Sequence, residues 1–181
     1  MKTCVIYKSK TGFTKRYAAW IAEELSCDSI DYEKCSQSLI KQYDCIIFGS
    51  RIHAGKIDGL KKFKSKYMCN ANCRLVVFAT GGTPQAQKDV IDSIWRANFS
   101  VKELEKVPHF YMQSGLNYEK MGTVDRLLMK TFAKMLSKKA DKSPAERGTE
   151  QGIGSSYDCS SREQITSLIQ YIKEQENRNL N

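Results

Sequence analysis

The sequence predicts an α/β protein with a doubly wound, five-stranded parallel sheet in the order 2-1-3-4-5 and helices on both faces. Short apolar runs of strand length alternate along the 181 residues with segments whose apolar residues recur at helical spacing. This alternation favours crossover connections between parallel strands, which place helices over both faces of a sheet. The hydrophobic content of 41% is enough for a buried core. We expect residues 1–181 to form a single domain.

Five segments are expected to form the strands, in chain order: Lys2–Tyr7, Cys27–Tyr32, Asp44–Gly49, Cys73–Ala79 and Pro108–Gln113. The third and fourth are continuous apolar runs, which are typical of buried strands. Glycine pairs with a small or polar neighbour follow them, at Gly49-Ser50 and Gly81-Gly82, and we expect both strands to end there.

Helical spacing predicts helices at Thr14–Leu25, Gly59–Tyr67 and Thr123–Lys138, a helix beginning at Thr83-Pro84, and a last helix with an apolar face of Ile165, Leu168, Ile169 and Ile172. Proline is favoured at a first helical position. Ser161 and Gln164 have the spacing of a capping box before the last helix. Residues 139–159 are expected to form a polar, glycine-rich connection.

The helix at Thr123–Lys138 combines an apolar side with a basic stripe. The stripe has a spacing of four residues and consists of Arg126, Lys130, Lys134 and Lys138. Two interpretations are open. The helix packs on the core with one solvated side, or it docks on anionic lipid, where quinones are found.

The formal net charge is +9, and the excess lies in residues 61–142, which hold 16 Lys and Arg against 7 Asp and Glu. Such a surface attracts nucleic acid, an acidic protein, anionic lipid or a carboxylated substrate, or it is only a solvated surface. The seven cysteines fit a reducing cytosol. Cys69 and Cys73 form the only close pair, and no second pair completes a zinc site, so we expect no metal. No signal peptide or membrane span is expected.

Ligands of doubly wound sheets bind beyond the carboxyl ends of the strands, so residues 8–14, 50–56 and 80–83 should meet at one edge. The first of these loops contains Ser9-Lys10-Thr11-Gly12-Phe13-Thr14 at the start of a helix, where unpaired N–H groups and the helix dipole favour an anion. A phosphate site and an ordinary capped helix start are both open. The loop has neither the P-loop spacing nor the dinucleotide glycine pattern.

The segment Ser9–Thr14 resembles the S/T-x-T-G-x-T phosphate loop of the flavodoxin family. The resemblance implies that Ser9, Lys10, Thr11, Gly12, Phe13 and Thr14 bind the phosphate end of FMN. Phe48–Lys56 is similar to the G-[AS]-x-I-x-x-G segment of one branch, the menaquinone-dependent protoporphyrinogen oxidases, although Ala54 stands where the branch often has an aromatic residue. Residues 114–118 and 125–130 are similar to that branch as well.

The loops at the sheet edge therefore supply further expected FMN-binding residues, which are Ser50, Arg51, Ile52, His53, Ala54, Gly55, Thr80, Gly81 and Gly82. His53 and Arg51 are the catalytic candidates, because a histidine can move a proton and a cation near the flavin raises its potential. Lys56 flanks the same loop, and both cations could instead point into water. His109, next to Pro108, is expected to be structural.

We therefore expect an FMN-dependent oxidoreductase, similar to the protoporphyrinogen oxidases, that passes electrons from a reduced organic substrate to a quinone or another acceptor. The alternative is an electron-carrying flavodoxin that docks on protein partners. A nucleic-acid-binding module is disfavoured, since the aromatic residues lie at core spacing. The expected location is the cytoplasm, with peripheral contact to the inner face of an anionic membrane left open.

Overall fold

The computed structural model describes residues 1–68, 72–142 and 153–178. Its strands are β1 (Thr3–Lys8), β2 (Asp28–Asp31), β3 (Cys45–His53), β4 (Lys56–Ile57), β5 (Arg74–Gly81), β6 (His109–Gln113), β7 (Gly115–Leu116) and β8 (Tyr157–Asp158). Its helices are α1 (Phe13–Leu25), α2 (Gln37–Ile40), α3 (Leu60–Phe63), α4 (Lys88–Asn98), α5 (Val101–Lys106), α6 (Thr123–Lys138) and α8 (Thr166–Arg178). Short helical turns occupy η1 (Tyr32–Lys34), η2 (Lys64–Met68) and η3 (Arg162–Ile165).

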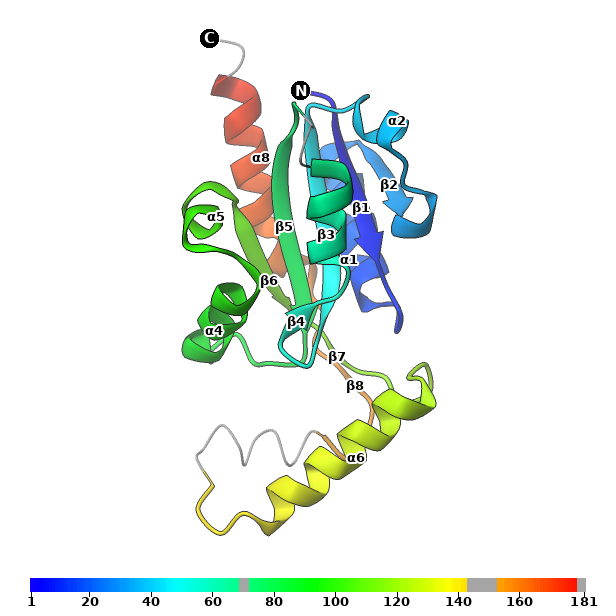
Figure 1. The fold of residues 1–181 in the computed structure, drawn as a ribbon, viewed down its shortest axis with the longest axis vertical. Coiled ribbons are helices and arrows are strands. Elements are labelled where there is room, and N and C mark those ends of the chain that lie inside the picture. Colours follow the sequence, from blue (N-terminus) through cyan, green and yellow to red (C-terminus); the bar gives the residue numbers. More distant parts are fainter. Residues whose placement is uncertain (69–71, 143–152, 179–181) are drawn as a thin grey trace.

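The main sheet has the order β2-β1-β3-β5-β6, and these five strands are all parallel. Strand β4 is a two-residue addition that pairs antiparallel to the end of β3. Without β4, the order is the predicted 2-1-3-4-5, so the predicted fold class is confirmed. Strands β7 and β8 form a separate antiparallel ribbon that leads to α6 (Figure 1).

Two hydrophobic cores cover the two faces of this sheet. On one face, Ile6, Phe48 and Val77 pack with Phe63 and Trp95 from the helical side that includes α3 and α4. On the other face, Val5, Ile47 and Phe78 pack with residues of α1 and α8. The predicted inward residues of the last helix, Ile165, Leu168, Ile169 and Ile172, all lie in this second core. Side chains alternate between the two faces along β1, β3 and β5. Both faces of the sheet therefore carry apolar residues, and helices cover both.

The predicted strand end at Gly49 is wrong, because β3 continues to His53. Gly49 pairs with Phe78 of β5, and a Cβ at Gly49 would lie 1.9 Å from Phe78 Cζ. The glycine therefore makes room for a neighbouring aromatic ring inside the sheet and does not terminate the strand. Strand β5, by contrast, ends at Gly81, where the Gly81-Gly82 pair predicted its end.

One predicted helix start and one predicted capping box are also wrong. Helix α4 begins at Lys88, because Tyr111 Oη lies 2.7 Å from the Thr83 carbonyl oxygen and the Gln113 side chain accepts from the Gln85 N–H. These contacts hold residues 83–85 against the sheet edge, and Pro84 begins a turn instead. At the last helix, Ser161 caps η3, but the Gln164 side chain donates to the Cys159 carbonyl, so the predicted capping box does not form.

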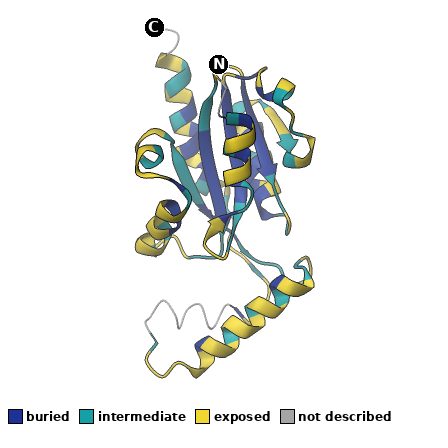
Figure 2. Ribbon diagram, in the orientation of Figure 1, coloured by how far each residue is buried: buried dark blue, intermediate teal, exposed yellow. Residues whose placement is uncertain are grey.

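Helix α6 has the predicted bounds but not the predicted core packing. It crosses beyond the carboxyl ends of the strands, away from the sheet, and most of its surface is exposed (Figures 1 and 2). Of its apolar side, Leu136 is buried, whereas the others are exposed: Val124, Leu127, Leu128, Phe132 and Met135. The interpretation that this side packs on the core is therefore wrong.

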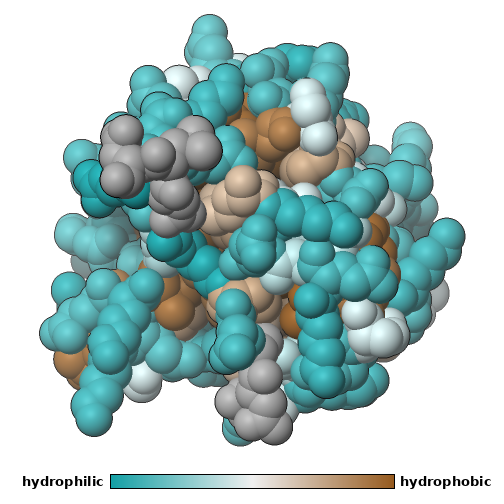
Figure 3. Space-filling model, turned by 90° about the horizontal axis from the view of Figure 1, so that it is seen from above, coloured by the Kyte–Doolittle hydropathy of each residue, from teal (hydrophilic) through white to brown (hydrophobic). Residues whose placement is uncertain are grey.

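The surface at the opposite end of the molecule is different in character. Seen from the amino ends of the strands, it is mostly hydrophilic, with apolar groups in small separate patches (Figure 3).

Among the helices that the structure describes, none is long and apolar enough to cross a membrane. Cys69, one of the close cysteine pair, and residues 143–152 of the predicted connection lie outside the described residues.

Candidate functional site

The three expected loops meet at the carboxyl edge of the sheet, around a cavity of about 440 Å³. Nine of the residues that the sequence predicts for the site line this cavity: Thr11, Phe13, Arg51, Ile52, His53, Ala54, Thr80, Gly81 and Gly82. Parallel strands β1, β3 and β5 end side by side, so loops that are far apart in sequence converge here.

The loop between β1 and α1 has the features of an anion site. Gly12 precedes the helix with φ of 97°, a conformation in which a Cβ is strained, and no side chain caps the first turn. The first N–H groups of a helix have no partner within it. The Ser9 Oγ is buried and has no hydrogen-bond partner in the described part of the chain. A hydroxyl and several N–H groups are therefore available to an anion with strong acceptors.

Thr14 lies deeper than the rest of this loop. Its side chain is 1% exposed, and its hydroxyl lies 2.8 Å from the hydroxyl of Thr80. One of the two hydroxyls donates to the other, so the pair retains one proton that can be donated elsewhere. This bond ties the start of α1 to the end of β5, and thus fixes the loop before α1 against the third loop.

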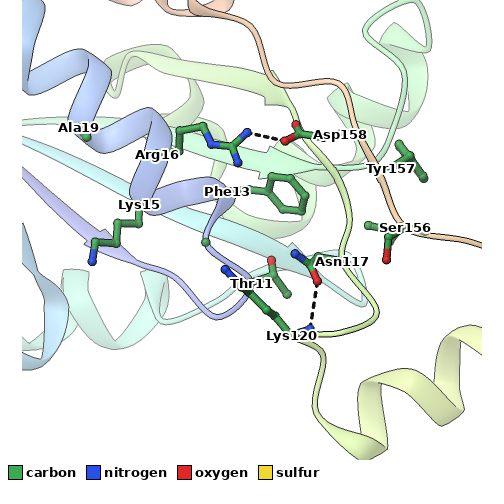
Figure 4. A pocket seen from close by; sticks show the side chains of 12 residues that line it. Thr11, Phe13, Lys15, Arg16, Ala19, Asn117, Lys120, Ser156, Tyr157 and Asp158 are labelled. Carbon is green, nitrogen blue, oxygen red and sulfur yellow. Dashed lines mark hydrogen bonds and ion pairs between the residues drawn. The ribbon is translucent and has the colours of Figure 1, made fainter.

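A second cavity, of about 650 Å³, lies on the outer side of the same loop (Figure 4). Thr11 and Phe13 line both cavities, so the loop forms the wall between them. Lys15, Arg16 and Lys120 surround the outer cavity, and Arg16 pairs with Asp158. The loop between β1 and α1 thus has positive side chains on its outer side.

The second loop is a tight hairpin between β3 and β4. Ala54 and Gly55 have φ of 48° and 75°, as a two-residue turn between antiparallel strands requires. Ala54 lines the cavity, but Gly55 is exposed, and a Cβ there would meet no atom within 4 Å. Ser50 is fully buried and its hydroxyl donates to the Lys8 carbonyl, so it links β3 to β1. Gly55 and Ser50 therefore lie outside the cavity lining.

Three charged or titratable side chains from two loops converge on Asp125 of α6. Its carboxylate accepts hydrogen bonds from Lys10 Nζ at 3.0 Å and from Arg51 Nη1 at 2.9 Å, and His53 Nε2 lies 3.1 Å from its other oxygen. Arg51 also lies 3.8 Å from Asp58, which pairs with Lys8. Lys10 and the two catalytic candidates thus share one carboxylate at the mouth of the cavity.

Asp125 is only 8% exposed, yet it remains ionised. The hydrogen bond from Lys10 is the main influence that lowers its pKa, to about 2; partial burial opposes this, and Arg51 adds to it. The cluster is therefore held by a carboxylate that stays charged across the neutral pH range.

Of the two cations that flank the second loop, one points away from the site and the other is paired, and His109 lies outside the site as expected. Lys56 Nζ donates to the Ala97 carbonyl and lines a different cavity, so Lys56 points away from the expected flavin site. Arg51 is paired and does not point into water. His109 packs against Trp95 and bonds the Val107 carbonyl, which agrees with a structural role.

The sequence analysis missed the wall that α6 adds to the cavity. Leu128, Met129 and Phe132 line it, together with Asp125 and Met121 before the helix. Residues 114–116 of the β7 segment complete the lining. The similarity of residues 114–118 and 125–130 to one flavoprotein branch was the signal that could have placed them here. Their helical spacing alone indicated a core helix.

The chain is similar in sequence and in structure to known proteins. A family model described as "Flavodoxin domain" matches residues 4–143. An uncharacterised protein of Methanocaldococcus jannaschii is 31% identical over 150 residues, which cover 76% of this chain and 99% of that protein. A solved archaeal flavodoxin is 19% identical, with a TM-score of 0.44, over 71% of this chain and 90% of its own. Oxidised flavodoxin 1 of Bacillus cereus is 19% identical, with a TM-score of 0.43, over 77% of this chain and 100% of its own.

Proposed function

The chain belongs to the flavodoxin domain family, and from this premise we propose that it is an FMN-binding redox protein that acts as an oxidoreductase. The observation that carries the proposal is the buried, unpartnered Ser9 Oγ in a loop at a helix N-terminus, next to a partly apolar cavity. A phosphate would satisfy this hydroxyl and the free N–H groups of the first turn. The cavity walls would then enclose a flat aromatic ring.

Different residues of the site would bind different parts of FMN. Ser9, Thr11 and the N–H groups of the first turn of α1 would hold the phosphate, since they lie at the helix start. Residues 51–54 and 80–82 would border the ring, because they line the cavity from two other loops. FMN, when bound, supplies the transfer of hydride or of single electrons. The compact loop, without a dinucleotide glycine pattern, favours FMN over FAD.

The charges around the cavity favour a bound flavin that accepts electrons from a substrate. Lys10 and Arg51 lie at its mouth with Asp125, while Lys8 and Asp58 form a neighbouring pair. A cation near a flavin favours the reduced, anionic form. Electron-carrying flavodoxins are generally acidic, whereas this chain has a net charge of +9. The basic surroundings therefore favour turnover of a substrate over a low-potential carrier role.

The finer interpretation is a reaction similar to that of the protoporphyrinogen oxidases, with a carboxylated, reduced organic substrate and a quinone or other acceptor. It rests on the residue similarities in the second loop and on the basic surface. The comparisons do not support that branch, so it stays a prediction. The cytoplasmic location also stays a prediction.

An electron carrier that docks on protein partners is the second candidate. The flavodoxin domain itself favours it, because this family includes such carriers. The two functions differ in what limits the reaction. A carrier exchanges electrons rapidly with a partner protein and has no saturable small-molecule site, whereas an oxidoreductase shows saturation with its substrate.

The test begins with purified protein mixed with FMN or FAD and passed over a desalting column. We expect one FMN per chain to remain, seen by visible absorbance, and far less FAD. If neither flavin is retained, the proposed function fails. The reduced, loaded protein is then reoxidised with a soluble menaquinone analogue and with a redox partner protein. Saturation with the analogue supports the oxidoreductase, and exchange with the partner protein alone supports the carrier.

A further inference from the structure

Helix α6 presents an apolar surface to solvent that a folded protein of this size would normally cover. Among the described residues, seven large hydrophobic side chains are exposed, and five of them lie on this one helix. Val124, Leu127 and Met135 are exposed by 69%, 67% and 67%, respectively. Contiguous apolar patches of this kind mark interaction sites. We propose that α6 is a docking surface for an anionic lipid bilayer.

The arrangement around the helix is that of an interfacial helix. At 3.6 residues per turn, the five exposed apolar residues cover an arc of about 140°. Lys130 and Lys134 flank this arc on one side, and Lys138 lies at its edge near the C-terminal end. Asp125, Leu136 and Met129 follow the other edge of this arc, next to Phe132, and burial is greatest there. Helices that lie in a membrane interface combine an apolar side with flanking basic residues.

Charge complementarity decides between the possible occupants. Helix α6 carries four basic residues, Arg126, Lys130, Lys134 and Lys138, against one acidic residue, Asp125, which is already engaged. A second copy of the chain would bring the same lysines together, and like charges disfavour that contact. An anionic bilayer offers both an apolar interior for the arc and negative headgroups for the lysines. It therefore matches both features at once.

The helix is fixed in place by contacts at its first turns. Asp125 is held by Lys10 and Arg51, and the Arg126 guanidinium donates to the Tyr118 carbonyl at 2.5 Å. Leu136 is buried further along. The exposed arc thus belongs to a helix that is anchored by neighbouring side chains outside the arc, so docking needs no unfolding of α6.

The docking surface adjoins the cavity. Leu128 and Phe132 belong to the exposed arc and also line the cavity at the sheet edge. A bilayer on α6 would therefore lie beside the cavity mouth, within reach of a lipophilic electron acceptor dissolved in it. This last step rests on the proposed function, whereas docking itself rests only on the helix.

The test is flotation of the full chain with two kinds of vesicle, phosphatidylcholine alone and phosphatidylcholine with phosphatidylglycerol. We expect binding to the anionic vesicles and little to the neutral ones, with an affinity that falls as salt is raised. The double change Lys130→Glu and Lys134→Glu should weaken binding by more than about 25-fold, since each basic residue near such a surface contributes about five-fold. The change Leu127→Ser with Met135→Ser should weaken it by about ten-fold or more.

Two control variants carry matched changes elsewhere. Lys61→Glu with Lys62→Glu reverses two exposed lysines near α3, and Val101→Ser removes a side chain of α5 that is 74% exposed. Both should bind vesicles like the unchanged protein. Equal binding to neutral vesicles, no binding to either kind, or an equal loss with the Lys61 and Lys62 variant would overturn the proposal.

Sedimentation velocity without lipid tests the competing occupant. We expect the unchanged protein and the Leu127 and Met135 variant to have the same mass in solution. A dimer that this variant dissociates would assign the arc to a second copy and overturn lipid docking. FMN retention is measured on the same samples, so the two proposals fail separately. Vesicle binding without FMN overturns only the proposed function, and FMN binding without vesicle binding overturns only this inference.

Discussion

Lys10 and Asp125 are 115 positions apart in the sequence and form an ion pair of 3.0 Å that joins the loop between β1 and α1 to α6. Arg51 and His53 approach the same carboxylate from the second loop. One side chain on α6 therefore links two of the loops that form the cavity. The position of the helix wall depends on this carboxylate more than on apolar packing, since the apolar side of α6 is largely exposed.

Asp125→Asn should loosen α6 while leaving the sheet intact. The amide retains the shape but loses the charge, and hydrogen bonds to charged groups contribute about 1.5–3 kcal/mol. We expect the amides of residues 123–138 to exchange with solvent at least about ten-fold faster, with unchanged exchange in β1, β3 and β5. Hydrogen exchange by mass spectrometry measures this. Asp141→Asn, an exposed position after the helix, is the control and should change nothing.

The same carboxylate predicts a dependence on pH. The folded pKa of Asp125 is lowered to about 2, chiefly by the hydrogen bond from Lys10, whereas an unfolded aspartate titrates near about 3.9. A lowered folded pKa means that the stabilisation is complete above about pH 4 and is lost as the pH falls through about 2. The Met129 methyl resonance, which reports on α6 beside the cavity, should be constant at neutral pH and shift only in strong acid. A shift of equal size in Asp125→Asn would contradict this assignment.

The sequence was most informative where one kind of pattern dominated. Continuous apolar runs such as Ile46–Phe48 placed the buried strands, because only a sheet covered on both faces accommodates them. The start of α1 within Ser9–Thr14 was predicted correctly, since glycine and hydroxyl residues mark such a turn. That this segment binds phosphate stays a prediction. Patterns of local chemistry are sufficient for these elements.

The remaining errors arose where tertiary contacts decide. In the sequence, Gly49-Ser50 resembles the end of a strand. In the structure, Gly49 lies inside the sheet, because the ring of Phe78 leaves no room for a Cβ at this position. Thr83-Pro84 has the composition of a helix start, but Tyr111 holds the segment against the sheet. The apolar residues of α6 have core spacing, and a single sequence does not reveal whether other elements lie opposite them. The role of Asp125 as the shared partner of Lys10, Arg51 and His53 depends on where α6 lies, and the sequence does not give that position.

Ser9→Ala should weaken FMN binding specifically. The Ser9 hydroxyl is buried without a partner, and a lost hydrogen bond to a charged phosphate costs about 1.5–3 kcal/mol, or about 10- to 150-fold in affinity. Fluorescence titration of FMN measures the change. Ser29→Ala, at an exposed position of β2, serves as the matched control. Equal affinities for all three proteins would place the phosphate elsewhere.

Gly12→Val should weaken FMN binding more severely than Ser9→Ala. A φ of 97° suits glycine and is strained for a β-branched side chain, so the loop must rearrange. We expect lost affinity together with a lower urea midpoint, because the positive φ at residue 12 also strains the folded chain. A variant that binds FMN normally would show that the backbone at Gly12 does not shape the site.

The cysteines should differ sharply in reactivity. Burial raises the pKa of Cys45 to about 12 and that of Cys27 to about 11, so about one in ten thousand Cys45 side chains is thiolate at pH 8. Cys159 is exposed. Brief alkylation of the native protein should modify Cys159 and spare Cys4 and Cys45, while alkylation in urea should reach all three. Peptide mass spectrometry reads the result, and rapid native labelling of Cys45 would show that β3 opens to solvent.

Gly49→Ala should destabilise the whole sheet. Phe78 is fully buried, and the added Cβ would lie 1.9 Å from its ring, so either the ring or strand β3 must shift. Overpacking of this kind costs about 1–3 kcal/mol or more, and urea unfolding followed by tryptophan fluorescence should show a lower midpoint. Adding Phe78→Leu should cost less in the Gly49→Ala background than alone, because residues in contact are not additive. Gly154→Ala, where a Cβ meets nothing within 4 Å, should leave the midpoint unchanged. If Gly49→Ala were equally silent, Gly49 would serve the chain only as a turn residue, as its sequence context had indicated.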